Sequence, residues 1–103
     1  MKTEKIDFKE IKAEDLDGNT IVLPETFAKD LGNRLYASAP NIDVADLGRK
    51  LHASFKDKTE LLLDKDELAL LNQMFDAVRL LGYPAHLSTK KYLENKLKSL
   101  DVN

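Results

Sequence analysis

The feature that most constrains this chain is a long apolar stretch between Thr59 and Tyr83, TELLLDKDELALLNQMFDAVRLLGY. From Leu68 to Leu81, its apolar residues recur at the three- and four-residue spacing of a helix. They cover well over half of the helix circumference, and a helix that is apolar on most sides is buried on most sides. The stretch therefore predicts a central helix around which the rest of the fold is arranged. We interpret its apolar side chains as core rather than as a ligand groove.

Local signals predict both ends of this helix. Asp64 can accept backbone N–H groups at the N-cap, and Glu67 can complete a capping box, so the helix is expected to begin at Lys65. Gly82 and then Pro84 predict its end just after Leu81. The preceding run, Leu61 to Leu63, is expected to form a short strand or an extended segment packed on the core.

The N-terminal segment predicts a β-hairpin. Lys5–Lys12 alternates apolar and charged residues, as a strand with one wet face does, and Ile11 is one residue out of phase, which indicates a bulge or a bend. Asp17-Gly18 is a strong hairpin-turn signal because both residues tolerate positive φ. The second strand is expected at Thr20–Leu23.

Three further helices are predicted. The first opens at Pro24 and ends before Pro40, and its Gly32 lies where another element can approach closely. The second is capped by Asn41 or Asp43. The last spans Ala85–Leu100 and begins at Pro84 or at a cap formed by Ser88 or Thr89. Their apolar stripes are Phe27, Leu31 and Leu35, then Val44, Leu47, Leu51 and Phe55, then Leu93, Leu97 and Leu100.

These elements predict an α+β fold within a single domain, residues 1–103. A hairpin alone is marginally stable, so the short strand at Leu61–Leu63 is expected to join it as a third strand. The expected architecture is a small antiparallel sheet packed on about four helices.

Composition excludes several classes of function. The chain has no cysteine, which rules out disulfides and thiol catalysis. It has no run near the length of a membrane span, and its charged N-terminus does not resemble a signal peptide, so a cytoplasmic protein with no membrane partner is expected. The formal net charge of −2 argues against nucleic acid as the main partner.

No motif carries recognisable chemistry. The segment Asp15–Asn19 resembles part of a calcium loop, but glycine falls at the wrong position and Thr26 stands where the last carboxylate is needed. His52 and His86 are the only histidines, and such pairs on separate elements seldom meet to bind a metal. We therefore predict a protein that is not an enzyme, with no catalytic, cofactor-binding or metal site and no cofactor.

The last predicted helix offers one candidate basic surface, formed by Lys90, Lys91, Lys96 and Lys98. Lysine-rich helix faces are usually solvated surface, and non-specific nucleic-acid binding needs clustered charge. The two helices around Pro40 are unlike a DNA-binding helix-turn-helix motif, because Asp43 and Asp46 in the first turn of the second helix would repel phosphate. A nucleic-acid-associated regulator is therefore the alternative hypothesis.

Three motifs carry a resemblance to a known group of proteins. They are K-I-D-F-K-x-I at Lys5–Ile11, D-x-x-G-N at Asp15–Asn19 and L-G-N-x-L-Y at Leu31–Tyr36. Together with the acid-capped apolar helix, they resemble small uncharacterised proteins encoded by bacterial phages and prophages. The likeness ends before the last helix, and it implies a small accessory or assembly protein with no catalytic residues.

The first functional hypothesis is a non-enzymatic module that binds an unidentified protein partner. Self-association is a second expectation, because hairpin strands leave an edge with unpaired backbone groups. The apolar residues of the last helix, with Tyr92 beside them, offer another surface. A weak homodimer through either surface is therefore a hypothesis.

Overall fold

Capping side chains fix the starts of two helices in the computed structural model, which describes residues 2–101. Asn41 Oδ1 accepts the Val44 N–H at 3.0 Å at the start of α2 (Ile42–Lys56). Asp64 Oδ1 accepts the Glu67 N–H at 2.8 Å, and Glu67 Oε1 accepts the Asp64 N–H at 3.0 Å, at the start of α3 (Lys65–Phe75). The predicted start of α3 is confirmed, and of the two alternatives for α2, Asn41 is the cap.

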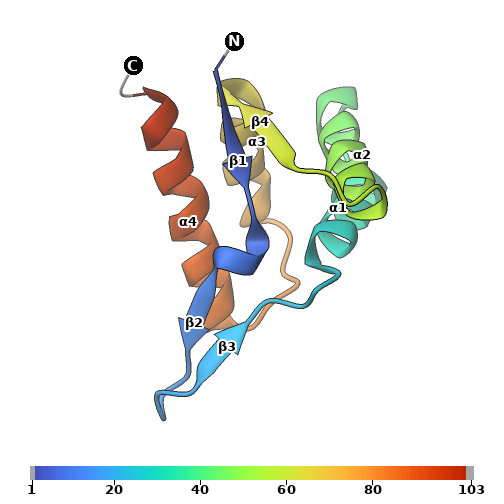
Figure 1. The fold of residues 1–103 in the computed structure, drawn as a ribbon. Coiled ribbons are helices and arrows are strands. Elements are labelled where there is room, and N and C mark those ends of the chain that lie inside the picture. The colour runs from blue at the N-terminus through green and yellow to red at the C-terminus, as the bar shows by residue number, and fades with distance from the viewer. Residues whose placement is uncertain (1, 102–103) are drawn as a thin grey trace.

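The predicted hairpin is present. Strands β2 (Lys12–Glu14) and β3 (Thr20–Val22) pair antiparallel, with Lys12 opposite Val22 and Glu14 opposite Thr20. Gly18 in the connecting turn has φ of +83°, which only glycine adopts readily. Figure 1 shows this hairpin extending below the body of the molecule.

The predicted single strand over Lys5–Lys12 is wrong. The chain forms β1 (Thr3–Ile6), then a 3₁₀ helix (Phe8–Glu10), and only then β2. Asp7 starts the 3₁₀ turn: its Oδ1 accepts the Lys9 N–H and its carbonyl accepts the Glu10 N–H. This turn rotates the chain so that both Phe8 and Ile11 are buried, which explains why Ile11 is out of phase in the sequence.

The two halves of this segment pair with different strands. β1 pairs antiparallel with β4 (Leu61–Asp64), from Thr3 opposite Asp64 to Ile6 opposite Leu61, whereas β2 pairs with β3. The expected strand at Leu61–Leu63 therefore exists, but it forms a second two-stranded sheet instead of joining the hairpin in one three-stranded sheet. The α+β class and the four helices are as predicted.

Helix α1 (Phe27–Ala37) begins three residues after Pro24, where its start was predicted. Pro24 lies in a turn instead, and its carbonyl accepts the Phe27 N–H at 3.0 Å. α1 and α2 cross where Gly32 faces Gly48. A Cβ built on Gly32 would lie 2.6 Å from the Gly48 carbonyl oxygen, and one built on Gly48 would lie 2.7 Å from the Gly32 carbonyl oxygen. The expected close approach at Gly32 is confirmed, and Gly48 is its counterpart.

Helix α3 ends at Phe75, so the predicted continuation to Leu81 is wrong. The N–H groups of Ala77 and Val78 turn back to the carbonyls of Met74 and Phe75, and this turn carries Val78 into the core. Asp76, at the end of the helix, is held by side chains of the next helix. Helix α3 therefore ends at a turn that buries Val78, and not at glycine or proline.

Helix α4 (Tyr83–Asp101) begins one residue before Pro84, close to the alternative that places its start at the proline. Gly82 therefore precedes α4 instead of closing α3, and its carbonyl accepts the His86 N–H at 2.9 Å. Thr89 lies inside the helix, where its buried hydroxyl donates to the Ala85 carbonyl at 2.8 Å.

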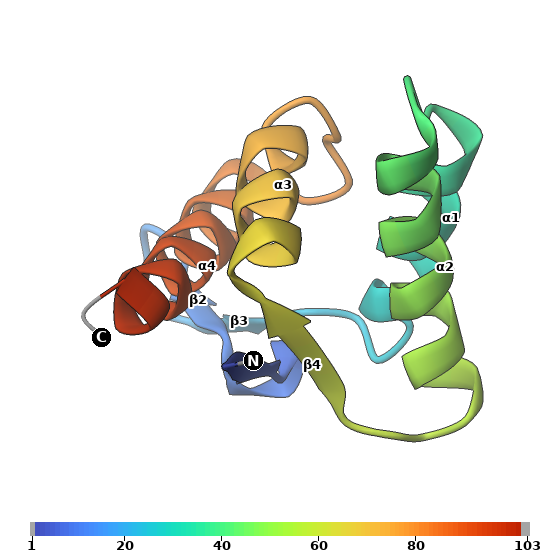
Figure 2. The same cartoon turned by 90° about the horizontal axis from the view of Figure 1, so that it is seen from above.

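The core lies between two pairs of helices. In Figure 2, α1 and α2 stand on one side, α3 and α4 on the other, and β1 and β4 lie beneath. Phe27 connects these parts, because its ring is edge-on to Phe8 at 5.0 Å and to Phe75 at 6.5 Å. Leu68, Leu71 and Phe75 of α3 are almost fully buried, as predicted. No helix within residues 2–101 is long and apolar enough to cross a membrane.

Candidate binding groove

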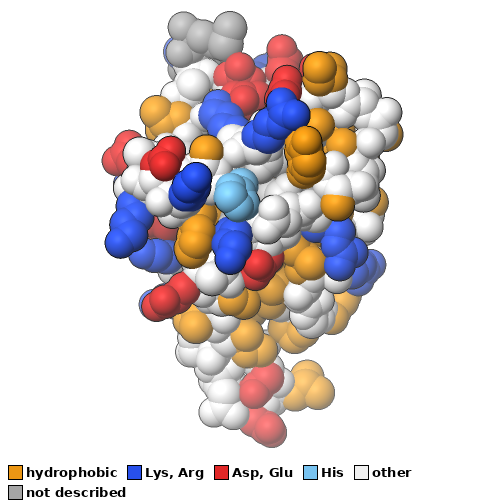
Figure 3. Space-filling model, turned by 90° about the vertical axis from the view of Figure 1, so that its right-hand side faces the viewer, with side chains coloured by type: hydrophobic (Ala, Val, Ile, Leu, Met, Phe, Trp, Pro, Cys, Tyr) orange, Lys and Arg blue, Asp and Glu red, His pale blue; other side chains and the backbone are white. Residues whose placement is uncertain are grey.

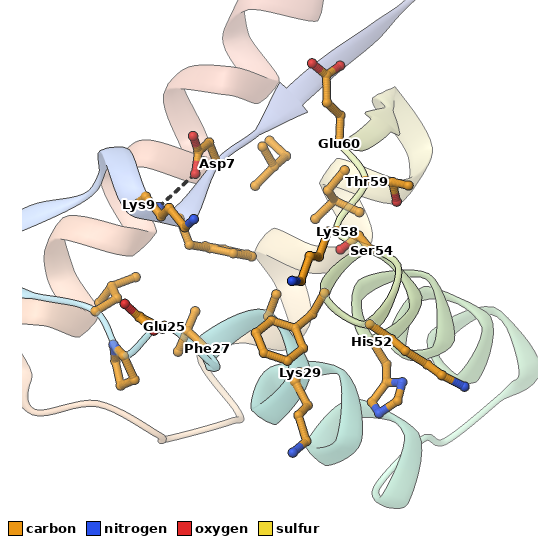
Figure 4. Close-up of a pocket in the computed structure, with 18 of the residues that line it drawn as sticks. Asp7, Lys9, Glu25, Phe27, Lys29, His52, Ser54, Lys58, Thr59 and Glu60 are labelled. Carbon is orange, nitrogen blue, oxygen red and sulfur yellow. Dashed lines mark hydrogen bonds between the residues drawn. The ribbon is translucent and has the colours of Figure 1, made fainter.

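A groove of about 960 Å³ separates the N-terminal segment from the α1–α2 pair (Figure 4). Its walls are β1 with the 3₁₀ helix, the start of α1, the end of α2 and the loop into β4. The residues that line it are Lys5, Ile6, Asp7, Phe8, Lys9, Leu23, Pro24, Glu25, Phe27, Ala28, Lys29, His52, Ser54, Phe55, Lys56, Lys58, Thr59, Glu60 and Leu61.

The groove has an apolar floor. Ile6, Phe8, Phe27 and Leu61 are buried members of the core that reach the groove from different elements. Phe55, at the end of α2, is half-buried there. The accessible apolar surface above these buried side chains belongs to Leu23, Ala28 and Phe55, which are half-buried, and to the exposed Pro24, and an apolar group placed on it would be removed from water.

Lysine dominates the rim. Five lysines and three carboxylates line the groove, although the whole chain has a formal charge of −2. Lys5 pairs with Glu60 at 3.5 Å. The other four form no ion pair within residues 2–101; they are Lys9, Lys29, Lys56 and Lys58. In Figure 3, which faces the outer side of α1 and α2, Lys and Arg side chains surround a histidine.

Lys58 has an uncommon backbone conformation. Its φ is +54°, and it is the one residue other than glycine with positive φ in the described part of the chain. The Lys58 N–H bonds to the Phe55 carbonyl and the Thr59 N–H to the Ser54 carbonyl, which is the Schellman ending of a helix. Glycine usually occupies this position, because a left-handed conformation costs other residues about 1–2 kcal/mol. A lysine therefore projects into the groove at some expense in stability (Figure 4).

The four lysines predicted as a basic surface are not equivalent. Lys90 pairs with Asp76 at 3.1 Å, and Lys96 pairs with Glu4 at 3.8 Å and lies over the Tyr92 ring. Lys91 and Lys98 are exposed. Two lysines of this set therefore tie α4 to the rest of the fold.

The joint between α3 and α4 contains the buried polar groups of the fold. His86 stacks on Phe75 with ring centroids 4.5 Å apart, and its Nε2 lies 3.3 Å from Asp76 Oδ1. Hydrogen bonds from Lys90 and from His86 hold the pKa of Asp76 below its ordinary value. Asn72 Nδ2 donates to the carbonyls of Leu68 and Leu93. These contacts orient the two helices.

The two histidines lie in different environments. His52 lines the groove, whereas His86 is buried at the α3–α4 joint and does not line it. Within residues 2–101, no three His, Asp or Glu side chains gather as a possible metal-ligand set.

Sequence reasoning did not find the groove. Its unpaired lysines come from the 3₁₀ helix, α1, the end of α2 and the following loop, so no single stretch of sequence is basic. The one local sequence signal of the basic rim is the Lys56-Asp57-Lys58 run, which is typical of an ordinary charged loop.

No family model, no curated protein and no solved structure matches this chain.

Proposed function

We propose that this protein is a non-enzymatic module that binds an acidic segment of another protein in the lysine-rimmed groove. The observation that carries the proposal is the placement of four unpaired lysines around an apolar floor in a chain of net negative charge. Lysines at a rim attract and orient acidic partners, while burial of apolar groups supplies affinity. The fitting partner carries carboxylates beside a large apolar side chain.

The conformation of Lys58 supports the same proposal. Left-handed backbone at a residue other than glycine is a cost that the rest of the fold must offset, and such positions cluster at functional sites. A glycine at position 58 would close α2 more favourably but would remove one of the four unpaired charges. The lysine is therefore better explained by binding than by folding.

Protein fits the groove better than nucleic acid does. Nucleic-acid binding rests on an extended basic stripe, whereas the groove offers four unpaired lysines within one short rim of a chain whose formal net charge is −2. Phe8 and Phe27 are buried and Phe55 alone of the groove's rings is half-buried, so the groove lacks the series of exposed rings on which successive bases stack. The alternative surface on α4 has less support, because Lys90 and Lys96 are already paired with carboxylates. The cytoplasmic location and the phage accessory role remain parts of the proposal that rest on the sequence alone.

A displayed library of random peptides tests this proposal. Selection on the purified protein should enrich peptides in which Asp or Glu flank Leu or Phe. The double variant Lys9→Glu/Lys29→Glu should lose this binding. The matched control Lys91→Glu/Lys98→Glu makes the same charge change on exposed lysines of α4 and should retain it.

Two further measurements complete the test. Lys58→Gly should be more stable than the parent protein yet bind the selected peptides more weakly. Enrichment of peptides without acidic residues, or equal binding by the Lys9/Lys29 variant, would overturn the proposal. Tight, salt-sensitive binding of duplex DNA that only the Lys91/Lys98 variant loses would establish the alternative instead.

A further inference from the structure

The tip of the β2–β3 hairpin presents an apolar side chain between carboxylates. The sequence from Glu14 to Asp17 is EDLD. The solvent-accessible area of Leu16 is 107% of that of a reference leucine, the highest value among the exposed large apolar residues. In Figure 3 the lower end of the molecule, where the hairpin extends, shows acidic and apolar side chains side by side. Leu16 therefore contributes its apolar surface to no part of the fold.

The tip is held in one conformation. Asp15 Oδ1 accepts the N–H groups of Asp17 and Asn19, both at 2.9 Å, and the left-handed Gly18 completes the turn. These hydrogen bonds also lower the pKa of Asp15, the bond from Asn19 most of all. A rigid loop with Leu16 at its apex loses little conformational freedom when it binds, so the tip is preorganised as a ligand.

We infer that the groove receives the hairpin tip of a second copy of this chain. The inference rests on the proposed function, since it names the acidic segment that the groove accepts. Leu16 of one copy would lie on the apolar floor between Phe8 and Phe55 of the other. The carboxylates beside Leu16 would face the unpaired lysines of the rim. Charge complementarity and the exposed leucine both select this tip as the occupant.

The contact joins two different surfaces of the chain. No residue from Glu14 to Asn19 lines the chain's own groove, and the hairpin extends away from the body (Figure 1), so each copy keeps one free tip and one free groove. Such a contact closes as a two-fold dimer where two copies insert their tips reciprocally, and otherwise produces a ring or an open chain of copies. It also differs from the contact through α4 hypothesised from the sequence, because Leu93 is fully buried and Leu97 and Leu100 are half-buried.

Sedimentation velocity over a wide concentration range tests the inference with complementary variants. The tip variant Leu16→Ser changes a fully exposed side chain, and the groove variant is Lys9→Glu/Lys29→Glu. The parent protein should form dimers or larger species at high concentration, and more readily at low salt. Each variant alone should remain monomeric, with association at least about 10-fold weaker, as the loss of one buried leucine requires.

Mixing the two variants gives the decisive result. The intact groove of the tip variant can accept the intact tip of the groove variant, so an equimolar mixture should form a one-to-one dimer and nothing larger. The control Ile42→Ser removes another exposed apolar side chain, 72% exposed at the start of α2, and should associate like the parent.

The outcomes separate this inference from the proposed function. A parent protein that stays monomeric up to its solubility limit, or a Leu16→Ser variant that associates like the parent, overturns the inference. If selected acidic peptides still bind the groove in that case, the proposed function stands and the natural occupant is a different protein. If neither peptides nor a cyclised peptide of residues 12–22 binds the groove, both proposals fail.

Discussion

Replacing Gly32 with alanine should destabilise the protein by about 1–3 kcal/mol, the usual cost of overpacking. At an ordinary helical position the same change would stabilise by about 1 kcal/mol, because alanine has the higher helix propensity. Here the new Cβ would lie 2.6 Å from the Gly48 carbonyl oxygen and 2.9 Å from the His52 nitrogen. Both are backbone atoms, which cannot move aside as a flexible side chain can.

The helices must therefore separate. Bringing the 2.6 Å contact to an ordinary 3.4 Å requires a shift of about 0.8 Å, and gaps of this size forfeit a quarter to a half of the dispersion energy of the atoms affected. The loss extends along the α1–α2 contact to Leu31 and Leu51, which are fully buried. The lost packing energy exceeds the gain in helix propensity, so Gly32→Ala should destabilise the protein.

Urea denaturation followed by far-UV circular dichroism measures the effect. Gly82→Ala is the matched control, because no atom beyond its chain neighbours lies within 4 Å of the added Cβ, and its stability should change by less than about 0.5 kcal/mol. Combining Gly32→Ala with Gly48→Ala should cost less than the sum of the two, since both separate the same pair of helices. A Gly32→Ala protein as stable as the parent, or more stable, would refute the reasoning.

Four further predictions concern the hairpin, the core and two ionisable groups. Gly18→Val should cost about 1–2 kcal/mol in urea denaturation, because φ at this position is +83°, and a cost no larger than that of Gly82→Ala would contradict it. Phe75→Ala should cost about 3–5 kcal/mol in a thermal melt, because the ring packs on both Phe27 and His86, and an unchanged melting temperature would place it outside the core. The lowered pKa of Asp76 contributes stability that is present above the ordinary carboxyl pKa of about 3.9 and is lost as the pH falls through the folded value. Asp76→Asn should therefore be less stable than the parent at neutral pH, with the difference shrinking in acid, and a difference independent of pH would contradict this assignment. Burial raises the pKa of Tyr92 to about 12, so spectrophotometric titration should show one tyrosine ionising well above the ordinary tyrosine value of 10.0, and loss of this transition in Tyr92→Phe would assign it to Tyr92.

The sequence by itself determined the features that depend on neighbours a few residues apart. The Asp64–Glu67 capping box and the left-handed Gly18 each depend on groups within four residues, so local rules predict them, and the same rules narrow the cap of α2 to Asn41 or Asp43. The apolar periodicity also identified the buried stripes of the helices and, with them, the α+β class. The close approach at Gly32 was foreseen because glycine beside an apolar stripe has few other uses.

Only the tertiary structure decided the features that depend on partners distant in the chain. Helix α3 stops at Phe75 and the following turn carries Val78 into the core, although the apolar pattern continues to Leu81. The N-terminal strand divides because its two halves pair with strands about 60 and 10 residues away, and this produced two sheets where one was expected. The groove depends most on residues that are distant in the chain. Its lysines are scattered along the sequence, and they become one basic rim only because the fold brings four separate segments around the same apolar floor.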